Sequence, residues 1–300
     1  MPCDAICHHV GVQGGRVVRG VGRRVAVGVD RARRLVPSPL YEKSRIVPAG
    51  ALCHWYHSMT LPESGEVTGV WDLRGRVDEY LGNADFAGKR VLEIGPASGF
   101  LTFEMERRGA EVVCVELPKG SSFDLVPFAG LDLESVRRDQ GETLQYMQNG
   151  FWRAHAELES SARVHHGDAQ GLPERLGTFD TSVIASVLQH LHDPVGVVRA
   201  CAARTTGTLV VTDLDGSAMT DLDDSAMSEG HIDGPVLELF PSVERPTPFT
   251  WWLLRPRLFE VLFDILGFTD VTTTYHDDPF VAEDRLLRSF TVVGHRLSGR

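Results

Sequence analysis

The sequence predicts an α/β protein built on a doubly wound, mainly parallel sheet with helices on both faces. Apolar strand patterns alternate with helical patterns from about residue 90 onward, which is the order that successive βαβ units require. A turn bracketed by Gly95 and Gly99 follows the first strand, and Glu116 ends the second strand, 21 positions after Gly95. A glycine turn and an acid in these places are typical of nucleotide-binding sheets. At 300 residues the chain can hold one large domain with additions.

The first βαβ unit is the most clearly patterned. Residues 90–94 are mainly apolar, as a parallel strand covered on both faces should be. Helical spacing of large apolar side chains predicts a helix over 100–108, and Gly109 ends it. A second apolar run, 111–115, brings Glu116 to the carboxyl end of its strand, about where this architecture places a carboxylate on a ribose diol.

The rest of the chain continues the alternation. Asp193 and Pro194 are a good amino cap and first helical position, so a helix is expected to follow them. Further strands are expected at 162–166, 178–187, 206–212, 270–275 and 290–295, and further helices at 134–147, 151–158, 195–203 and 258–266. The total is seven strands, of which the last two form an antiparallel pair on a mainly parallel sheet.

Charge is distributed unevenly along the chain. The formal net charge is −11, yet residues 1–50 contain nine Lys or Arg against three Asp or Glu and carry +6, which leaves −17 on the remainder. An acidic body repels a phosphate backbone, so a general nucleic-acid role is disfavoured. We also expect no membrane segment, because the amino-terminal stretch contains no span of 18 apolar residues.

Residues 1–48 are interpreted as a basic, disordered extension. They are rich in Gly, Val and Arg, offer few large apolar residues to a core, and lack the apolar segment of a signal peptide. Cys3, Cys7, His8 and His9 are residue types that bind zinc, but no second ligand pair follows at regular spacing, and no metal site is predicted. Five scattered cysteines indicate a reducing compartment, so a cytoplasmic protein is expected.

The turn itself separates two kinds of nucleotide site. A dinucleotide site requires Gly-x-Gly-x-x-Gly, whereas this chain has Glu93-x-Gly95-x-Ala97-x-Gly99. This run resembles the first motif of the class I S-adenosylmethionine-dependent methyltransferases, with Ala97 where a glycine is commonest. The resemblance implies a Rossmann-like methyltransferase sheet of seven strands. It also implies S-adenosyl-L-methionine as cofactor, held by this motif, with its ribose on Glu116.

Three further positions extend the resemblance on the donor side. Asp168, 52 residues after Glu116, resembles the methyltransferase acid that accepts the adenine amino group, and the backbone of Ala169 would lie beside the ring. A plain turn aspartate is the alternative. Ser186 lies at the end of the predicted fourth strand, near where donor and acceptor meet. Because ligands of open α/β sheets bind outside the carboxyl ends of the strands, these positions are expected to share one crevice.

Segments ahead of the sheet narrow the resemblance to one branch of the family. Residues 55–62 and 68–74, together with Asn149-Gly150-Phe151-Trp152, resemble a branch similar to the carboxymethyltransferase of tRNA wobble uridine and its small-molecule relatives. The resemblance implies that Trp71 and Arg74 close over the methionine end of the donor, with Arg74 pairing with its carboxylate. Packing against the sheet edge is the alternative for Trp71. The acidic body argues against an RNA substrate.

Residues 49–300 are expected to form the methyltransferase domain, with three segments outside the minimal sheet. These are an N-terminal cap (49–84), a helical insertion (118–161) and a substrate lid (213–253). Long connections in a compact domain are usually functional or disordered. The acceptor is expected to lie between the cap and an aromatic wall of the lid, in contact with Tyr56, His57, Phe249, Trp251 and Trp252.

His190 and His192 follow the fourth strand and are the candidate catalytic residues. Histidine is the side chain most able to remove a proton near neutral pH, and a turn-fixing hydrogen bond is the alternative role. A base is needed only if the acceptor is protonated, because the sulfonium is already activated and alignment in a water-poor site supplies much of the rate. If neither histidine acts, His231 and Asp233 are the next candidates.

The sequence therefore predicts a methyltransferase that acts on an oxygen or a carbon of a small, apolar or aromatic acceptor in specialised metabolism. A tRNA uridine-modifying methyl- or carboxymethyltransferase is the alternative, and RNA binding with steep salt dependence would identify it. An alternative of another class is a catalytically silent donor-binding protein, which would bind S-adenosylmethionine yet methylate nothing. Neither the acceptor's identity nor the oligomeric state can be read from the sequence.

Overall fold

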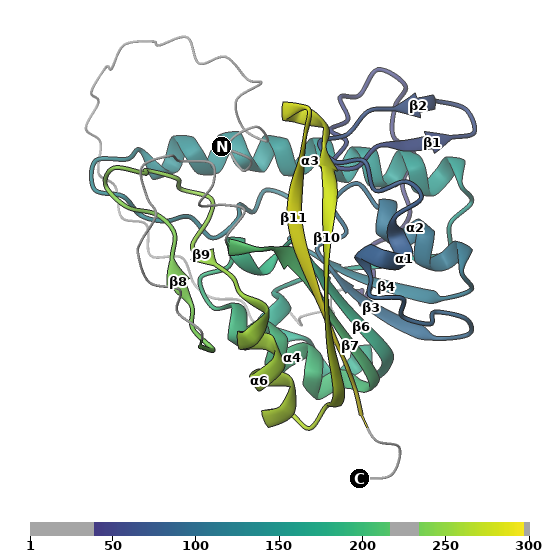
Figure 1. The fold of residues 1–300 in the computed structure, drawn as a ribbon. Coiled ribbons are helices and arrows are strands. Elements are labelled where there is room, and N and C mark those ends of the chain that lie inside the picture. Colours follow the sequence, from purple (N-terminus) through teal and green to yellow (C-terminus); the bar gives the residue numbers. More distant parts are fainter. Residues whose placement is uncertain (1–38, 217–233, 297–300) are drawn as a thin grey trace, which may run out of the picture.

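The computed structural model describes residues 39–216 and 234–296. Within them, seven strands form one sheet in the order β10-β11-β7-β6-β3-β4-β5 (Figure 1). The strands are β3 (Arg90–Ile94), β4 (Glu111–Glu116), β5 (Arg163–His166), β6 (Phe179–Ala185), β7 (Thr205–Leu214), β10 (Thr269–Phe280) and β11 (Arg285–His295). This sheet confirms the predicted Rossmann-like α/β fold class.

The order of pairing defines where a ligand can enter. Strand β3 pairs in parallel with β4 and β6, and the outer pairs β4–β5 and β6–β7 are also parallel. Only β11 runs against its neighbours, β7 and β10, as expected for the last two strands. The chain leaves β3 towards β4 and β5 and later returns on the other side with β6 and β7, so strand order reverses between β3 and β6. Ligands of open α/β sheets bind at such a point.

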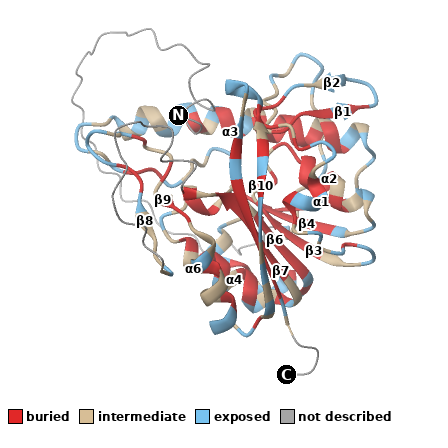
Figure 2. Ribbon diagram, viewed as in Figure 1, coloured by how far each residue is buried: buried red, intermediate tan, exposed pale blue. Residues whose placement is uncertain are grey.

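Helices cover both faces of the sheet because successive strand residues point to opposite sides. Val91 of β3 packs with α1 (Val77–Tyr80), α2 (Phe100–Arg107) and α3 (Leu133–Glu157), whereas its neighbour Leu92 packs with α4 (Pro194–Arg204) and α6 (Pro256–Ile265). Figure 2 shows the buried residues concentrated in the central strands and in the helix faces turned towards them. The 3₁₀ turns are η2 (Ala169–Gly171), η3 (Glu174–Leu176), η4 (Leu188–His190) and η5 (Val281–Glu283).

Local signals set several helix ends. The Asp193 carboxylate accepts a hydrogen bond from the Gly196 N–H at 2.8 Å, and Pro194 begins α4, as predicted. Helix α2 starts directly after Gly99, whose φ of +92° is accessible to glycine without strain. A Cβ at Gly99 would also lie 2.5 Å from the Phe103 ring, so the turn needs glycine for packing as well.

The insertion differs from its prediction, because α3 is one continuous helix rather than two. Residues 148–150, which separate the two predicted helices, lie inside it. Gly150 is needed for close packing: a Cβ there would lie 3.0 Å from the carbonyl oxygen of His54 in the cap. Tertiary contact therefore offsets the roughly 1 kcal/mol that a glycine costs within a helix.

Strand structure also forms in two segments for which no strand was predicted. In the cap, β1 (Met59–Leu61) and β2 (Gly65–Val67) make an antiparallel hairpin. In the described part of the lid, β8 (Glu238–Leu239) pairs with β9 (Trp252–Leu253). Strands β10 and β11 are longer than predicted, since each pairs with a partner along most of its length.

The expected boundary of the basic extension, at residue 48, is wrong. The backbone N–H of Glu42 donates to the Val164 carbonyl of β5 at 2.8 Å, and the Arg45 guanidinium donates to Asn149 of α3 at 3.0 Å. Residues 40–45 are thus tied to the domain. Residues 1–38, with the cysteine and histidine cluster, lie outside the described residues, as do His231 and Asp233. No helix in the described ranges is long and apolar enough to cross a membrane.

Candidate functional site

A cavity of about 440 Å³ opens at the carboxyl ends of β3, β4, β5 and β6, beside the point where strand order reverses. It gathers most of the predicted site residues, which lie far apart in the sequence. Those that line it are Tyr56, His57, Glu93, Gly95, Ala97, Glu116, Asp168, Ala169, Ser186, His190, His192 and Phe249. Gly99, Trp71, Arg74, Trp251 and Trp252 do not line it.

The glycine turn forms one wall of the cavity. Gly95 has φ +69°, and its N–H donates to the Val115 carbonyl at 2.9 Å. This hydrogen bond ties the turn after β3 to the neighbouring strand β4. A Cβ at this position would lie 2.8 Å from Val187 Cγ2, so a side chain here would displace the segment after β6. Ala97 also has positive φ, +50°, a conformation that is strained for alanine. Strain at a turn that lines a cavity is typical of ligand-binding sites.

Glu116 is a buried carboxylate in the part of the cavity beside the glycine turn. Its side chain accepts hydrogen bonds from the backbone N–H of Leu117, at 2.6 Å, and from that of Ala97. Burial nevertheless raises the pKa of Glu116 to about 7, although these hydrogen bonds and nearby His166 oppose the shift. A carboxyl group that lines a cavity with so few donors can accept hydrogen bonds from ligand hydroxyls.

Glu93 lies deeper, at the end of β3. Its Oε2 accepts a hydrogen bond from Thr102 Oγ1 at 2.5 Å and lies 3.4 Å from the Cys114 thiol. Burial raises the pKa of Glu93 to about 7, and the proximity of Glu116 adds to the shift. One oxygen of Glu93 thus contacts side chains of both α2 and β4. These contacts hold the elements on either side of the glycine turn together, and Glu93 also lines the cavity.

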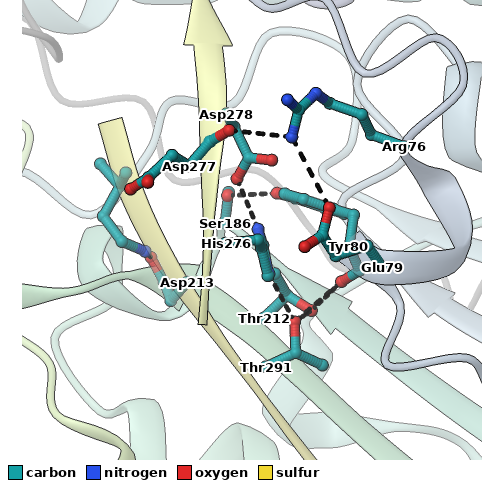
Figure 3. A network of polar contacts seen from close by, with 11 residues as sticks. Arg76, Glu79, Tyr80, Ser186, Thr212, Asp213, His276, Asp277, Asp278 and Thr291 are labelled. Carbon is teal, nitrogen blue, oxygen red and sulfur yellow. Dashed lines mark hydrogen bonds and ion pairs between the residues drawn. The ribbon is translucent and has the colours of Figure 1, made fainter. Parts of the chain in front are cut away.

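A buried polar network supports the floor of the cavity below Ser186. Ser186 has φ +51°, and its hydroxyl lies 2.8 Å from the Tyr80 hydroxyl (Figure 3). The Tyr80 carbonyl in turn accepts hydrogen bonds from Thr212 and Thr291 at 2.8 and 2.9 Å. His276 bonds to Thr291 at 2.9 Å and to a neighbouring aspartate of β10 at 2.8 Å. The network thereby joins α1, β7, β10 and β11 to the strained residue at the end of β6.

Asp168 and Ala169 lie at the opposite rim, at the end of β5. The Asp168 carboxylate is exposed and accepts a hydrogen bond from the Gln170 N–H at 2.9 Å, which starts the η2 turn. The turn-forming alternative for Asp168 is therefore realised in this structure. Its position on the cavity rim leaves the second carboxylate oxygen for a ligand amino group.

His190 is a partly buried titratable group that lines the cavity near Phe123 and Phe249. Its Nδ1 lies 2.7 Å from the Phe249 carbonyl oxygen, and because a carbonyl can only accept, Nδ1 must carry the proton. Burial lowers the pKa of His190, so the ring is neutral near pH 7 and Nε2 holds a lone pair. The Phe123 ring stacks on it with centroids 6.2 Å apart. This arrangement suits a base that removes a proton from a hydroxyl.

The two other histidines differ from His190. His57 is 5% exposed, and burial lowers its pKa to about 3, so its ring stays neutral throughout the physiological range. Its Nδ1 has no hydrogen-bond partner in the described chain. His192 lies at the rim, where its backbone N–H donates to Asp124 at 3.1 Å and its ring meets Trp251 edge-on. Of the two predicted bases, only His190 has a tautomer defined by a ring hydrogen bond among the described contacts.

Four residues that were expected to contact a ligand make other contacts within the protein. The Arg74 guanidinium is half-exposed and pairs with Asp72 and Glu66, and the buried Trp71 ring packs against Phe280 at 4.8 Å. Neither residue lines the cavity in this structure, so their expected closure over the donor stays a prediction. In the lid, the indole N–H groups of Trp251 and Trp252 donate to the carbonyls of Asp124 and Leu191 at 3.0 and 2.9 Å. These tryptophans fix the lid to the loops, whereas Phe249 reaches the cavity.

The sequence reading missed one wall of the site. Helix α3 contributes Gln140, Leu144 and Met147, and the segment before it contributes Phe123 and Asp124. The three helical residues are spaced i, i+4 and i+7, so they share one face, a spacing that could have revealed them. Among the described residues, no group of three or more His, Cys, Asp or Glu side chains is arranged to hold a metal ion.

Comparison with known proteins agrees with this geometry. No protein-family model matches the chain. The ubiquinone biosynthesis O-methyltransferase of Xanthomonas oryzae pv. oryzae is 32% identical over 130 residues, which are 42% of this chain and 43% of that protein. The protein of the same name from Neisseria meningitidis is 31% identical over 144 residues, 47% of this chain and 50% of that protein. The chain thus spans about half the length of the curated relatives it matches.

Two solved structures resemble the chain at low sequence identity. One is the N-terminal domain of EvdMO1 with S-adenosylhomocysteine (SAH) bound, with a TM-score of 0.46 and 19% identity over 81% of this chain and 92% of that one. The other is magnesium protoporphyrin IX methyltransferase from Synechocystis PCC 6803 with bound SAH, with a TM-score of 0.45 and 13% identity over 75% and 82%. The sheet order, the glycine turn, the buried carboxylate and the partial matches to these relatives agree with the predicted resemblance to the class I S-adenosylmethionine-dependent methyltransferases.

Proposed function

We propose that the protein transfers a methyl group from S-adenosylmethionine to a hydroxyl group of a small, largely apolar or aromatic molecule. The observation that carries the proposal is the composition of this cavity. One half has a strained glycine turn and a buried carboxylate, Glu116, and the other has a neutral histidine, His190, between Phe123 and Phe249. The matched relatives, named ubiquinone biosynthesis O-methyltransferases, support a small acceptor and oxygen methylation.

The donor half fits a nucleoside joined to an amino acid. Glu116 can accept hydrogen bonds from the ribose hydroxyls, and Asp168 can accept one from the adenine amino group. No phosphate has to be neutralised, which agrees with a cavity whose charged residues are mainly carboxylates. When bound, the donor supplies an activated methyl group on its sulfonium. Because Arg74 is paired with acids outside the cavity, we infer that other groups meet the amino-acid end.

His190 acts on the acceptor side by accepting a proton. Its Nε2 would take the hydroxyl proton while the acceptor oxygen bonds to the methyl carbon and the carbon–sulfur bond of the donor breaks, so that SAH leaves and the ring becomes an imidazolium. The Phe249 carbonyl, already 2.7 Å from Nδ1, stabilises that charge and holds the ring in place. The lid excludes water, because the indole groups of Trp251 and Trp252 tie it to the cavity loops.

The setting proposed for this reaction is specialised metabolism in the cytoplasm. The buried free thiols of Cys114 and Cys201 are consistent with a reducing compartment. Transfer to tRNA stays the alternative, but none of the described contacts favours it, and the body of the chain is acidic.

A methyl-transfer panel tests the proposal. The full chain is incubated with S-adenosylmethionine and a set of phenols, hydroxylated quinolones and aliphatic alcohols, and SAH release and product mass are measured. We expect transfer to aromatic hydroxyls and at least a 10²-fold loss in His190→Ala. Transfer to tRNA alone would favour the alternative. SAH binding without transfer to any acceptor would favour a catalytically silent donor-binding protein.

A further inference from the structure

Among the described residues, one buried amide side chain that lines the cavity has no hydrogen-bond partner for either of its polar atoms. Gln140 of α3 is 3% exposed and lines the cavity, yet neither its Oε1 nor its Nε2 makes a hydrogen bond within the described chain. A buried amide with both atoms unpaired is destabilising, so folded proteins rarely keep one without a reason. The other α3 residues on the same face of the cavity, Leu144 and Met147, are apolar.

The position of Gln140 on α3 assigns it to the acceptor half. Gln148, on the same helix, donates to the carbonyl of Leu117 at 3.1 Å, directly after Glu116 in β4. Eight residues of α-helix separate the two glutamines by about 12 Å along the helix axis and by roughly 80° around it. Gln140 therefore lies well beyond the part of the helix that borders Glu116, the carboxylate proposed to bind the ribose.

Contacts of the neighbouring segment agree with this assignment. A Cβ at Gly141 would lie 3.5 Å from the Ser121 carbonyl oxygen, so this turn of α3 packs against residues 121–124. Phe123 of that segment stacks on His190. Gln140 and the proposed base thus border the same end of the cavity.

We propose that Gln140 recognises the acceptor by pairing with an edge that presents a hydrogen-bond donor and an acceptor side by side. A primary carboxamide offers N–H and C=O in the same arrangement, and a lactam or another carboxamide complements both. The apolar neighbours on α3 would contact the rest of the molecule. The inferred substrate class is therefore an aromatic hydroxyl compound with a lactam or carboxamide edge, and this inference rests on the proposed methyl transfer to a small acceptor.

Thermal unfolding of the ligand-free protein tests the role of the amide without an acceptor. Gln140→Leu removes an unsatisfied polar group and should raise Tm by about 2–4 °C. Gln148→Leu is the matched control, because it deletes a formed hydrogen bond and should lower Tm. Equal losses of Tm in both variants would show that Gln140 is structural and would overturn the proposal.

Binding of a matched probe pair tests the recognition itself. Dissociation constants of 4-hydroxy-2-quinolone and its N-methyl derivative, which lacks the N–H, are measured by calorimetry in saturating SAH. Wild type should prefer the N–H compound by roughly tenfold or more, and Gln140→Leu should lose this preference while SAH affinity stays unchanged. A preference that persists in Gln140→Leu, a loss of SAH affinity in that variant, or no binding of either probe refutes the proposal.

The same measurements separate this inference from the proposed function. Wild type that binds the N–H probe selectively but transfers no methyl to any acceptor contradicts the methyltransferase proposal and leaves recognition by Gln140 intact. Methyl transfer to other acceptors without selective binding of the probe contradicts the recognition proposal alone.

Discussion

Donor binding should depend on pH through one carboxyl group, Glu116. Burial raises its pKa from 4.5 to about 7, while ribose hydroxyls bind best to the ionised form. As pH falls below 7 the carboxylate becomes protonated, and the affinity for donor should fall with it. At pH 6 about a tenth of the groups are ionised and at pH 8 about nine tenths, so the Kd for SAH should be roughly tenfold higher at pH 6 than at pH 8.

Glu116→Gln isolates this effect. The amide keeps the shape but cannot ionise and offers only one acceptor atom, so binding should be nearly independent of pH. At pH 8 it should be weaker than wild type by about 10- to 100-fold, which corresponds to the 1.5–3 kcal/mol of a charge-assisted hydrogen bond. Isothermal titration calorimetry with SAH at pH 6, 7 and 8 measures both quantities.

Glu93→Gln is the control for the second raised carboxyl group. The Glu93 Oε2 is already bonded to Thr102, so this variant should keep the wild-type pH dependence of SAH binding. A wild-type Kd that does not change between pH 6 and 8, or wild-type affinity in Glu116→Gln, would refute the assignment of Glu116 to the ribose.

The remaining predictions concern stability, catalysis and the donor's amino-acid end. In wild type, ionisation of Glu93 should lower the free energy of unfolding by about 3 kcal/mol as pH rises from 4.5 through about 7, and Glu93→Gln should lack this decrease. Urea unfolding at pH 5 and 8 measures the change, and the same change in both proteins would contradict the prediction. His190→Ala should lower kcat by about 10² or more with little change in SAH affinity, and full turnover in that variant would exclude it as the base. Because burial lowers the pKa of His190 below 6.5, wild-type kcat should hold between pH 7 and 8 and fall at lower pH; a fall above pH 7 would contradict the neutral ring. Arg74→Ala should leave the Kd for SAH within about twofold, since surface ion pairs contribute little, and a tenfold loss in calorimetry would restore it to the donor site.

The sequence by itself determined the sheet and the glycine turn and acid that line one part of the cavity. Three of the signals are local, because each depends on only a few neighbouring residues. They are the runs of buried strand residues, the turn with positive φ at Gly95 and the helix cap at Asp193. The acid at the end of β4 follows from the same short unit. Such features can be recognised without knowledge of long-range contacts, because backbone geometry and strand burial directly limit which residue types can occupy each position.

Only the tertiary structure decided which side chains reach the cavity. Trp71 and Arg74 have the chemistry of donor ligands, but Phe280 and nearby acids engage them, and partners so distant in sequence leave no local pattern. The continuous helix α3 depends on the cap packing against Gly150, and that helix brings Gln140 to the acceptor half. Composition and spacing indicate what a residue can do, whereas packing determines which competing partner it meets.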